Sequence, residues 1–401
     1  MVTVGTVATA GALVGAALWR KRPGLGALTG AIAAPVLGYL AIGVGGGLKK
    51  QGASNALAAL AAAGVGSPVM RVLLTGLAGF IGHHVGEAIL KSTDWEIVGL
   101  DRLDGTSTQH RLTEIEDWEK HKHRVRFVWH DLKAELNGYV QDKIGPVDHI
   151  VHLAASTHVD RSILHPMEFV MDNVVGTCNL LQYAVVQQTL RGRLRKLVYF
   201  STDEVFGPAP AQTRYSEWDR YRSGNPYAAS KAGGEELAVA FHNTYRLPVL
   251  ITHTMNVFGE RQHHEKFIPN TIQKVLKGEK VIVHADQTCT QPGSRYYIHA
   301  RNVAAAVLFL LEHGTAGEKY NIVGEREVNN LELAEFVAKT LDKRLHCELV
   351  DFHSSRPGHD LRYALDGQKL QAMGFEYPKG FEESLAKVIR WSVDHPYWLG
   401  M

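Results

Sequence analysis

Short apolar runs alternate with longer segments of mixed polarity from residue 70 onward. Each run is short enough for a buried strand, and the segments between them, above all 166–188 and 227–246, are long enough for helices. This alternation predicts an α/β fold with a doubly wound, Rossmann-like parallel sheet, whose ligands bind at the carboxyl ends of the strands. The six expected strands occupy residues 70–75, 95–101, 125–132, 147–155, 196–201 and 247–253.

The pattern before residue 70 is different. Met1–Trp19 and Pro23–Leu48 are uncharged and rich in Ala and Gly, and the basic clusters RKR and KK follow them. Each uncharged run is about long enough to cross a bilayer, although Ala and Gly are only weakly apolar. We expect membrane contact through residues 1–50, with an unanchored Ala/Gly extension and a cleavable targeting segment as alternatives. A signal peptide would carry its basic residues before the apolar run, and here they come after it.

The first expected strand leads into a glycine-rich turn and then a helix. Gly76, Gly79 and Gly82 allow backbone N–H groups to approach a pyrophosphate at the start of the helix. Asp101 ends the second strand, where a carboxylate accepts hydrogen bonds from the adenosine ribose and favours NAD. Arg102 follows it and is the feature that would favour NADP instead. Asp131, near the end of the third expected strand, is expected near the adenine.

Three parts of the chain follow from these patterns. Residues 1–69 are an Ala/Gly-rich extension and linker, and residues 70–255 form an NAD-binding domain. Residues 256–401 form mainly a smaller, substrate-binding lobe, from which segments such as the helix at 300–313 return to the core.

Charge and composition exclude several classes of protein. The 43 basic and 41 acidic residues nearly balance, so no basic field indicates a nucleic-acid partner. Three scattered cysteines indicate a reducing compartment without a disulfide framework, which agrees with a cytoplasmic catalytic domain. The 21 histidines form no metal-ligand spacing, and we expect no metal site.

The candidate catalytic residues follow the fifth strand. Thr202, Asp203 and Glu204 come directly after it, and Tyr227 and Lys231 share one face of the next helix. We expect the cation of Lys231, together with the positive nicotinamide of NAD⁺, to lower the pKa of Tyr227 so that it acts as a base.

The strings STDEVFG, YAASK, AASTHVDRSI, NVFGERQHHEKFIP, GSRYYIHARNVA and RPGHDLRYALD, with the glycine turn, resemble an extended short-chain dehydrogenase/reductase. The subgroup is the nucleotide-sugar 4,6-dehydratases, which includes dTDP-glucose 4,6-dehydratase. The resemblance covers about residues 70–395. Two stretches depart from it, Ser156-Thr157 where the family more often has ES, and 256–260 where it has NNYGP. These departures leave the exact sugar open.

The resemblance implies a mechanism for the adjacent carboxylates. Tyr227 takes the O4 proton of the sugar, Thr202 helps to hold O4, and Lys231 orients the nicotinamide ribose. Asp203 is the acid for the departing C6 hydroxyl and Glu204 the base for the C5 proton. Asp203 must be protonated for this role, and we expect its carboxylate neighbour to raise its pKa.

The resemblance also implies the binding residues. We expect a homodimer and a nucleotide-sugar substrate with dTDP or UDP as the nucleotide. The cofactor-binding residues would be Gly76, Gly79, Phe80, Ile81, Gly82, Asp101, Asp131, Leu132, Leu153, Ala154, Ala155, Ser201, Tyr227 and Lys231. The substrate-binding residues would be His158, Asp160, Arg161, Asn256, Lys266, Arg295 and Arg356.

Other functions stay open at this point. A nucleotide-sugar 4-epimerase or a UDP-glucuronate decarboxylase shares the fold, but neither requires an adjacent Asp–Glu pair. A catalytically silent NAD-binding scaffold at a membrane requires none of the five catalytic candidates.

Overall fold

A computed structural model describes residues 69–352 and 361–401 of the protein. Its centre is a seven-stranded parallel sheet in the order β11-β6-β5-β4-β1-β2-β3. The strands are β1 (Arg71–Thr75), β2 (Glu96–Asp101), β3 (Val125–Trp129), β4 (His149–His152), β5 (Lys196–Thr202), β6 (Val249–Thr254) and β11 (Lys319–Ile322). The expected Rossmann-like sheet is confirmed, and all six predicted strands are present.

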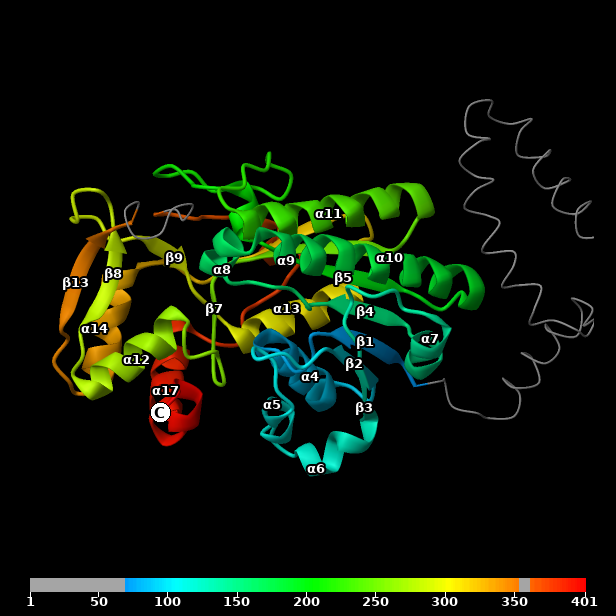
Figure 1. Ribbon diagram of the computed structural model, residues 1–401, viewed down its shortest axis with the longest axis horizontal. Coiled ribbons are helices and arrows are strands. Elements are labelled where there is room, and N and C mark those ends of the chain that lie inside the picture. Colours follow the sequence, from blue (N-terminus) through cyan, green and yellow to red (C-terminus); the bar gives the residue numbers. More distant parts are fainter. Residues whose placement is uncertain (1–68, 353–360) are drawn as a thin grey trace, which may run out of the picture. The chain divides into compact units, whose positions relative to one another are not determined.

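Helices cover both faces of this sheet (Figure 1). On one face lie α10 (Gly176–Val186) and α11 (Pro226–Tyr245), and on the other lie α4 (Phe80–Ser92) and α13 (Ala300–His313). The inner strands β1, β2, β4, β5 and β6 are buried on both sides, which explains their nearly continuous apolar sequences. The edge strand β3 is only partly buried, and its Trp129 is 70% exposed.

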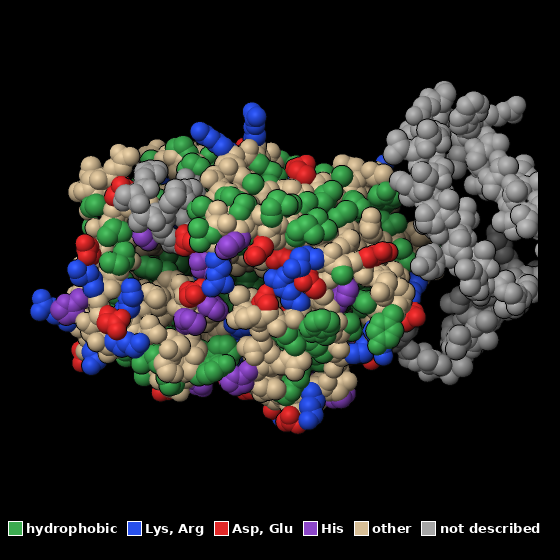
Figure 2. Space-filling model, in the orientation of Figure 1, with side chains coloured by type: hydrophobic (Ala, Val, Ile, Leu, Met, Phe, Trp, Pro, Cys, Tyr) green, Lys and Arg blue, Asp and Glu red, His purple; other side chains and the backbone are tan. Residues whose placement is uncertain are grey.

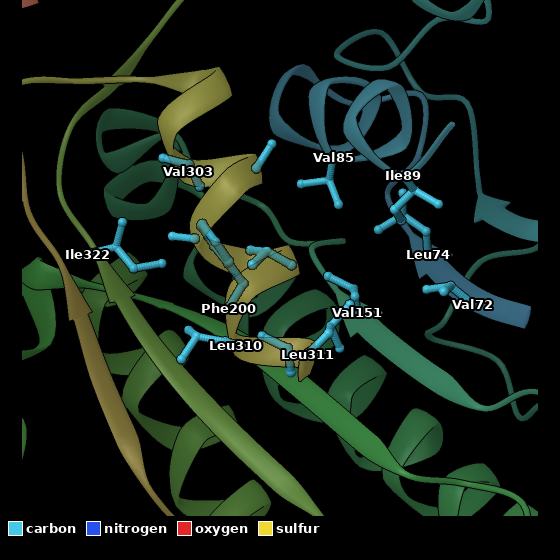
Figure 3. Close-up of a cluster of buried hydrophobic side chains, with 14 of the residues drawn as sticks. Val72, Leu74, Val85, Ile89, Val151, Phe200, Val303, Leu310, Leu311 and Ile322 are labelled. Carbon is cyan, nitrogen blue, oxygen red and sulfur yellow. The ribbon is translucent and has the colours of Figure 1, made fainter. Parts of the chain in front are cut away.

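The core beneath α4 and α13 joins distant parts of the chain. Figure 3 shows Val85 and Ile89 of α4, and Val303 and Leu310 of α13, directed toward strand residues such as Val151. The helix at 300–313 therefore packs in the core, although it follows segments of the second lobe.

Shorter elements connect the strands of the sheet. They are α5 (His110–Thr113), α6 (Trp118–His121), η1 (Lys122–Arg124), α7 (Gly138–Ile144), α8 (Val159–Leu164), α9 (Pro166–Val170), η2 (Met171–Val175), η3 (Gln187–Arg191) and η4 (Asp203–Phe206). The segments α9, η2, α10 and η3 follow one another without a break, so the predicted helix at 166–188 is present with two local π-helical turns.

The second lobe has its own apolar core. Its parallel strands β8 and β13 and its helices α12, α14 and α17 lie on the left of Figure 1. Its elements are β7 (Val257–Phe258), α12 (Phe267–Lys277), β8 (Val281–Ala285), β9 (Ser294–Tyr296), β10 (Ile298–His299), β12 (Glu327–Asn329), α14 (Asn330–Thr340), β13 (Cys347–Asp351), α17 (Phe381–Asp394) and η5 (Pro396–Leu399). The helix α16 (Gln368–Ala372) instead packs against β11, with Leu370 in the core beneath α4 and α13.

The sequence did not predict the seventh strand. β11 pairs in parallel with β6, with Tyr320 opposite Thr252, and it lies at the edge of the sheet. It has only four residues after a long apolar helix, so its own pattern is too short to separate from the helix end.

The expectations for residues 1–50 lie outside the described residues, as do the extension and linker up to residue 68. Across 69–352 and 361–401, no helix combines the length and the apolar character that crossing a bilayer requires.

Candidate active site

The turn between β1 and α4 is built for close backbone approach. Gly76 has φ +73°, in the left-handed region, and a Cβ at Gly82 would lie 1.9 Å from the Gly76 carbonyl oxygen. Gly79 precedes α4 and provides no side-chain cap. The first N–H groups of the helix thus have no capping side chain, and a pyrophosphate would satisfy them.

A cavity of about 640 Å³ opens beside this turn at the carboxyl ends of the strands. Most of the predicted cofactor residues line it, namely Gly76, Gly79, Phe80, Ile81, Gly82, Asp101, Asp131, Leu132, Leu153, Ala154 and Ala155. The predicted residues Ser201, Tyr227 and Lys231 are buried and are not among its lining residues. The glycine cradle and this lining fit a dinucleotide.

Asp101 is held at the edge of the cavity by three hydrogen bonds. Its Oδ2 accepts from Ala78 N at 3.0 Å, and its Oδ1 accepts from Leu103 N and Ser107 Oγ, each at 2.9 Å. A carboxylate oxygen has two acceptor positions, so Oδ2 can accept one further bond from a ribose hydroxyl.

Arg102 is already paired with carboxylates. It donates to both oxygens of Asp172 at 2.7 and 3.0 Å, and its Nε donates to Asp104 at 2.8 Å. A guanidinium held in this way offers little to a 2′-phosphate, so the geometry favours NAD over NADP.

Two buried oxygen atoms lie at the end of β5 without a partner in the described part of the chain. They are Ser201 Oγ and Asp203 Oδ2. The other carboxylate oxygen of Asp203 accepts a hydrogen bond from Thr202 Oγ1 at 3.0 Å. Buried polar atoms are normally paired, so these two are candidates for contact with a bound molecule.

The pKa of the Asp203 carboxyl is raised above its ordinary value. Burial, and next the carboxylate of Glu204, raise the pKa of Asp203 to about 7, while Arg295 opposes the rise. The expected direction is therefore found, but desolvation is a larger cause than the neighbouring carboxylate.

Glu204 is half-buried and anchored by a residue that the sequence analysis missed. Asn225 Nδ2 donates to Glu204 Oε2 at 3.0 Å. Asn225 Oδ1 accepts from Ala228 N at 2.8 Å and so caps the N-terminus of α11. The signal was present, because Asn before Pro226 is typical of a helix start.

In the protein alone, the pKa of Tyr227 is raised and that of Lys231 is lowered. Burial, and next the carboxylate of Glu204, raise the pKa of Tyr227, and a hydrogen bond with Thr202 opposes this. The Lys231 ammonium lies 4.5 Å from the centre of the Tyr199 ring, and burial lowers its pKa to about 7. Desolvation therefore dominates both groups in the protein alone, and a lowered pKa of Tyr227 from Lys231 together with the positive nicotinamide of NAD⁺ stays a prediction.

The predicted substrate residues divide into two groups. His158, Arg161 and Lys266 line the cavity, and Arg161 donates to both oxygens of Glu265 at 2.9 and 3.2 Å. Figure 2 shows charged and histidine side chains gathered across the middle of the face of the molecule that is turned toward the viewer. Glu265 was missed because its partner lies 104 residues earlier in the chain.

The other predicted substrate residues do not line this cavity. Asp160 lies on α8, and Asn256 is exposed between β6 and β7. Arg295 donates to the carbonyl oxygens of Ser294 and Leu361, each at 2.7 Å. Its guanidinium is nevertheless near enough to Asp203 to oppose the rise in that residue's pKa. Arg356 lies outside the described residues.

Comparisons with known proteins agree with this geometry. The model of the NAD dependent epimerase/dehydratase family matches residues 72–323. A dTDP-glucose 4,6-dehydratase of Streptomyces niveus is 36% identical over 335 residues, which cover 82% of this chain and 94% of that protein.

Two further relatives extend the comparison. A trifunctional UDP-glucose 4,6-dehydratase/UDP-4-keto-6-deoxy-D-glucose 3,5-epimerase/UDP-4-keto-L-rhamnose-reductase of Arabidopsis thaliana is 35% identical over 82% of this chain, which spans 48% of its length. The crystal structure of DesIV, a dTDP-glucose 4,6-dehydratase from Streptomyces venezuelae with NAD bound, has a TM-score of 0.73 and 34% identity. The match covers 82% of this chain and 98% of that one.

Proposed function

Since this chain belongs to the NAD dependent epimerase/dehydratase family, we propose that it is a nucleotide-sugar 4,6-dehydratase, a hydro-lyase with NAD as its cofactor. The substrate is a nucleotide-activated hexose, dTDP- or UDP-glucose, and the product is the 4-keto-6-deoxy sugar. Bound NAD supplies a hydride acceptor for C4 and a hydride donor for C6, so the reaction consumes no external oxidant.

Three of the five candidate residues transfer protons, Thr202 binds O4, and Lys231 would orient the nicotinamide ribose. Tyr227 takes the O4 proton, and Thr202, which is hydrogen-bonded to Tyr227, holds O4 beside it. The C5 proton, made acidic by the 4-keto group, passes to Glu204. Asp203 gives its proton to the C6 hydroxyl as the C6–O bond breaks and water leaves. The double bond between C5 and C6 would then accept hydride at C6 and, at C5, the proton held by Glu204.

The adjacent carboxyl groups of Asp203 and Glu204 at the end of β5 carry this proposal. Asp203 is 4% exposed with its pKa raised to about 7, and Glu204 beside it is fixed by Asn225. Elimination of water needs one carboxyl that keeps its proton and one that is free to accept a proton. Two carboxyls in different environments meet that need, as in other enzymes that use one as acid and one as base.

A 4-epimerase or a decarboxylase of the same fold needs only the tyrosine base and the cofactor. Neither function uses a buried acid next to Glu204. Burial of the Asp203 carboxyl without a compensating charge is unfavourable for folding at neutral pH. A catalytically silent scaffold would have no use for such a group.

The test is a mass-spectrometric assay of the protein with dTDP-glucose and UDP-glucose in parallel. Loss of one water from either, with no added cofactor consumed, supports the dehydratase and identifies the preferred nucleotide. An isomer of unchanged mass would indicate epimerisation, and loss of carbon dioxide from a UDP-glucuronate control would indicate decarboxylation.

The Glu204→Gln variant separates hydride transfer at C4 from the elimination of water. We expect it to lose elimination while hydrogen at C4 still exchanges with the cofactor. Dehydration by this variant at the parental rate would overturn the role proposed for Glu204.

The substrate side of the proposal rests on family position and charge. Lys266, Arg161 and His158 line the cavity, and Arg295 lies near Asp203, so these residues would meet the diphosphate and sugar. Asp160, Asn256 and Arg356 are proposed with them on family position alone.

We propose a homodimer that forms through the apolar surface of α8, α9 and η2 with the adjoining helices α10 and α11. Leu164 is 74% exposed and Met167 is 67% exposed, and Val170 and Met171 are also exposed. Figure 2 shows a continuous hydrophobic area over these helices. A patch of this kind marks an interaction surface. Light scattering should give the mass of a dimer, and Met167→Glu should shift it toward a monomer.

Membrane contact through residues 1–50 and a cytoplasmic catalytic domain stay predictions. Co-sedimentation of the full chain with anionic vesicles tests the first, with a variant that has Ser in place of all five N-terminal basic residues as a control.

A further inference from the structure

The segment 396–399, η5, lies against α5 and Glu114 of the cofactor-binding domain. Trp398 Nε1 donates to the carboxylate of Glu114 at 3.0 and 3.3 Å. The ring of Trp398 stacks on His110 with 5.4 Å between ring centroids, and the Arg111 guanidinium lies 5.2 Å from its centre. Trp398 is 8% exposed and Arg111 is 2% exposed, so the contact between their side chains is buried.

Arg111 connects this contact to the cofactor cavity. It is 2% exposed and lines the cavity. Its Nη1 donates to Ala78 O at 3.0 Å, within the glycine turn, and to Thr106 O at 2.8 Å, on the loop after β2. One guanidinium therefore fixes both backbone segments that face the predicted pyrophosphate and ribose.

Arg261 makes a second connection from the other lobe. Its carbonyl oxygen accepts from Arg111 Nε at 3.0 Å, and its Nη1 donates to Glu114 O at 3.2 Å. Its Nε donates to His83 Nε2, on α4, at 3.0 Å. The helix that begins at the glycine turn is thus tied to the same group of residues.

The segment 396–399 is itself anchored in the second lobe. Gln273 Nε2 on α12 donates to Leu399 O at 2.7 Å. Trp398 consequently reaches from an anchored position in one lobe to α5 of the other, directly after the loop that faces the cofactor.

We propose that Trp398 and Arg111 form a brace that fixes the glycine turn and the loop 102–109, and that this brace controls how tightly NAD is retained. Both are positioning residues in this proposal. Trp398 acts through Arg111 and Glu114, and Arg111 acts through the carbonyl oxygens of Ala78 and Thr106. The inference depends on the cofactor and does not depend on the sugar chemistry.

The experiment measures how fast bound NAD exchanges with excess deuterated NAD⁺ in the full chain, without nucleotide-sugar present. Trp398→Leu removes the stack and the hydrogen bond to Glu114, and Trp398→Phe removes only the hydrogen bond. Trp218→Leu is the matched control, because Trp218 is 57% exposed, lies outside the cavity lining and contacts a cation of its own, Lys319.

We expect exchange to be about tenfold faster in Trp398→Leu, a few-fold faster in Trp398→Phe and unchanged in Trp218→Leu. Arg111→Lys, which keeps the charge but loses the forked donors, should accelerate exchange with Trp398 intact. With saturating NAD, the KM for the nucleotide-sugar should stay within about twofold of the parent in the Trp398 variants.

Parental exchange rates in both Trp398→Leu and Arg111→Lys would overturn the brace. A proportional loss of NAD affinity, nucleotide-sugar affinity and thermal stability would also overturn it, because that result indicates general loosening of the fold. The exchange assay needs no turnover, so its outcome is independent of whether the protein is a dehydratase.

Discussion

Asn225 holds Glu204 and the start of α11 at the same time. One side-chain atom, Nδ2, donates to the Glu204 carboxylate at 3.0 Å, and the other, Oδ1, accepts from the backbone of Ala228 at 2.8 Å. The proposed C5 base is thereby fixed relative to the helix that carries Tyr227.

Replacing Asn225 should therefore separate a stability effect from a catalytic one. Asn225→Ala loses the cap and the bond to Glu204, and we expect about 1 kcal/mol less stability with elimination slowed about 10- to 100-fold. Asn225→Ser keeps a capping hydroxyl, so it should recover most of the stability while elimination stays slow. Urea unfolding and single-turnover mass spectrometry measure the two effects. Equal recovery of both in Asn225→Ser would show that Asn225 acts only as a cap.

Dehydration should slow as the pH rises through neutrality. Asp203 acts as an acid in its protonated form, and burial and Glu204 raise its pKa to about 7. Above that value the protonated fraction falls about tenfold per pH unit, and kcat should follow it when elimination limits the rate. Rates measured from pH 6 to 9 test this.

Lys231 is the control for this profile, because burial lowers its pKa to about 7 as well. Lys231→Arg keeps a charge throughout the range, so a descending limb that persists in this variant belongs to Asp203. A limb that disappears would assign the pH dependence to Lys231.

The carboxyl of Asp203 should also destabilise the folded protein at alkaline pH. Its folded pKa of about 7 lies above the ordinary value near 4, so the unfolded chain releases the proton first. The contribution of Asp203 to the free energy of unfolding is greatest below about pH 4. It falls as the pH rises to about 7 and is constant above that value. The difference corresponds to at most about 4 kcal/mol.

Asp203→Asn removes this penalty. We expect the variant to be more stable than the parent at pH 8, by on the order of 2 kcal/mol, and nearly equal to it at pH 4. Urea unfolding at both values gives the comparison. A variant that is less stable than the parent at pH 8 contradicts the assigned environment of Asp203.

The glycine turn offers a steric test. A Cβ at Gly82 would lie 1.9 Å from the Gly76 carbonyl oxygen, so Gly82→Ala must displace the turn. We expect purified Gly82→Ala to retain little NAD. Gly138→Ala is the control, because a Cβ there has no atom within 4 Å, and it should keep its NAD. The NAD released per protomer on denaturation is the measurement.

Cofactor preference depends on the acidic groups around β2. Asp172 accepts two hydrogen bonds from the Arg102 guanidinium, and Asp101 is expected to bind the ribose. Asp101→Ala with Asp172→Ala frees the two terminal nitrogens of Arg102 from Asp172, while its bond to Asp104 remains, and it removes the repulsion between Asp101 and a 2′-phosphate. We therefore expect the preference for NAD over NADP to fall at least tenfold. Calorimetric titration with both dinucleotides measures it, and an unchanged ratio would exclude Arg102 as a determinant.

The sequence was informative where the signal is local. The apolar runs predicted six strands, and the spacing of Gly76, Gly79 and Gly82 predicted the turn that the structure contains. The direction of the Asp203 pKa followed from its neighbour alone, although burial is the larger cause.

It was least informative where distant residues meet. Trp398 and Glu114 are 284 positions apart, and Arg161 and Glu265 are 104 apart, so no spacing rule connects them. For Tyr227 and Lys231, helix spacing predicts a shared face, but it gives no information on how far each group is desolvated. Burial raises the pKa of the tyrosine, and Lys231 lies over Tyr199.

The position of β11 has a consequence for the order in which the chain is made. β6 ends at Thr254, but its outer neighbour spans Lys319–Ile322, so the sheet lacks its edge strand until those residues leave the ribosome. During that interval β6 presents an unpaired edge, the kind of surface that invites aggregation. The two lobes are therefore interleaved in synthesis as well as in space, and a fragment cut at residue 255 would keep that edge exposed permanently.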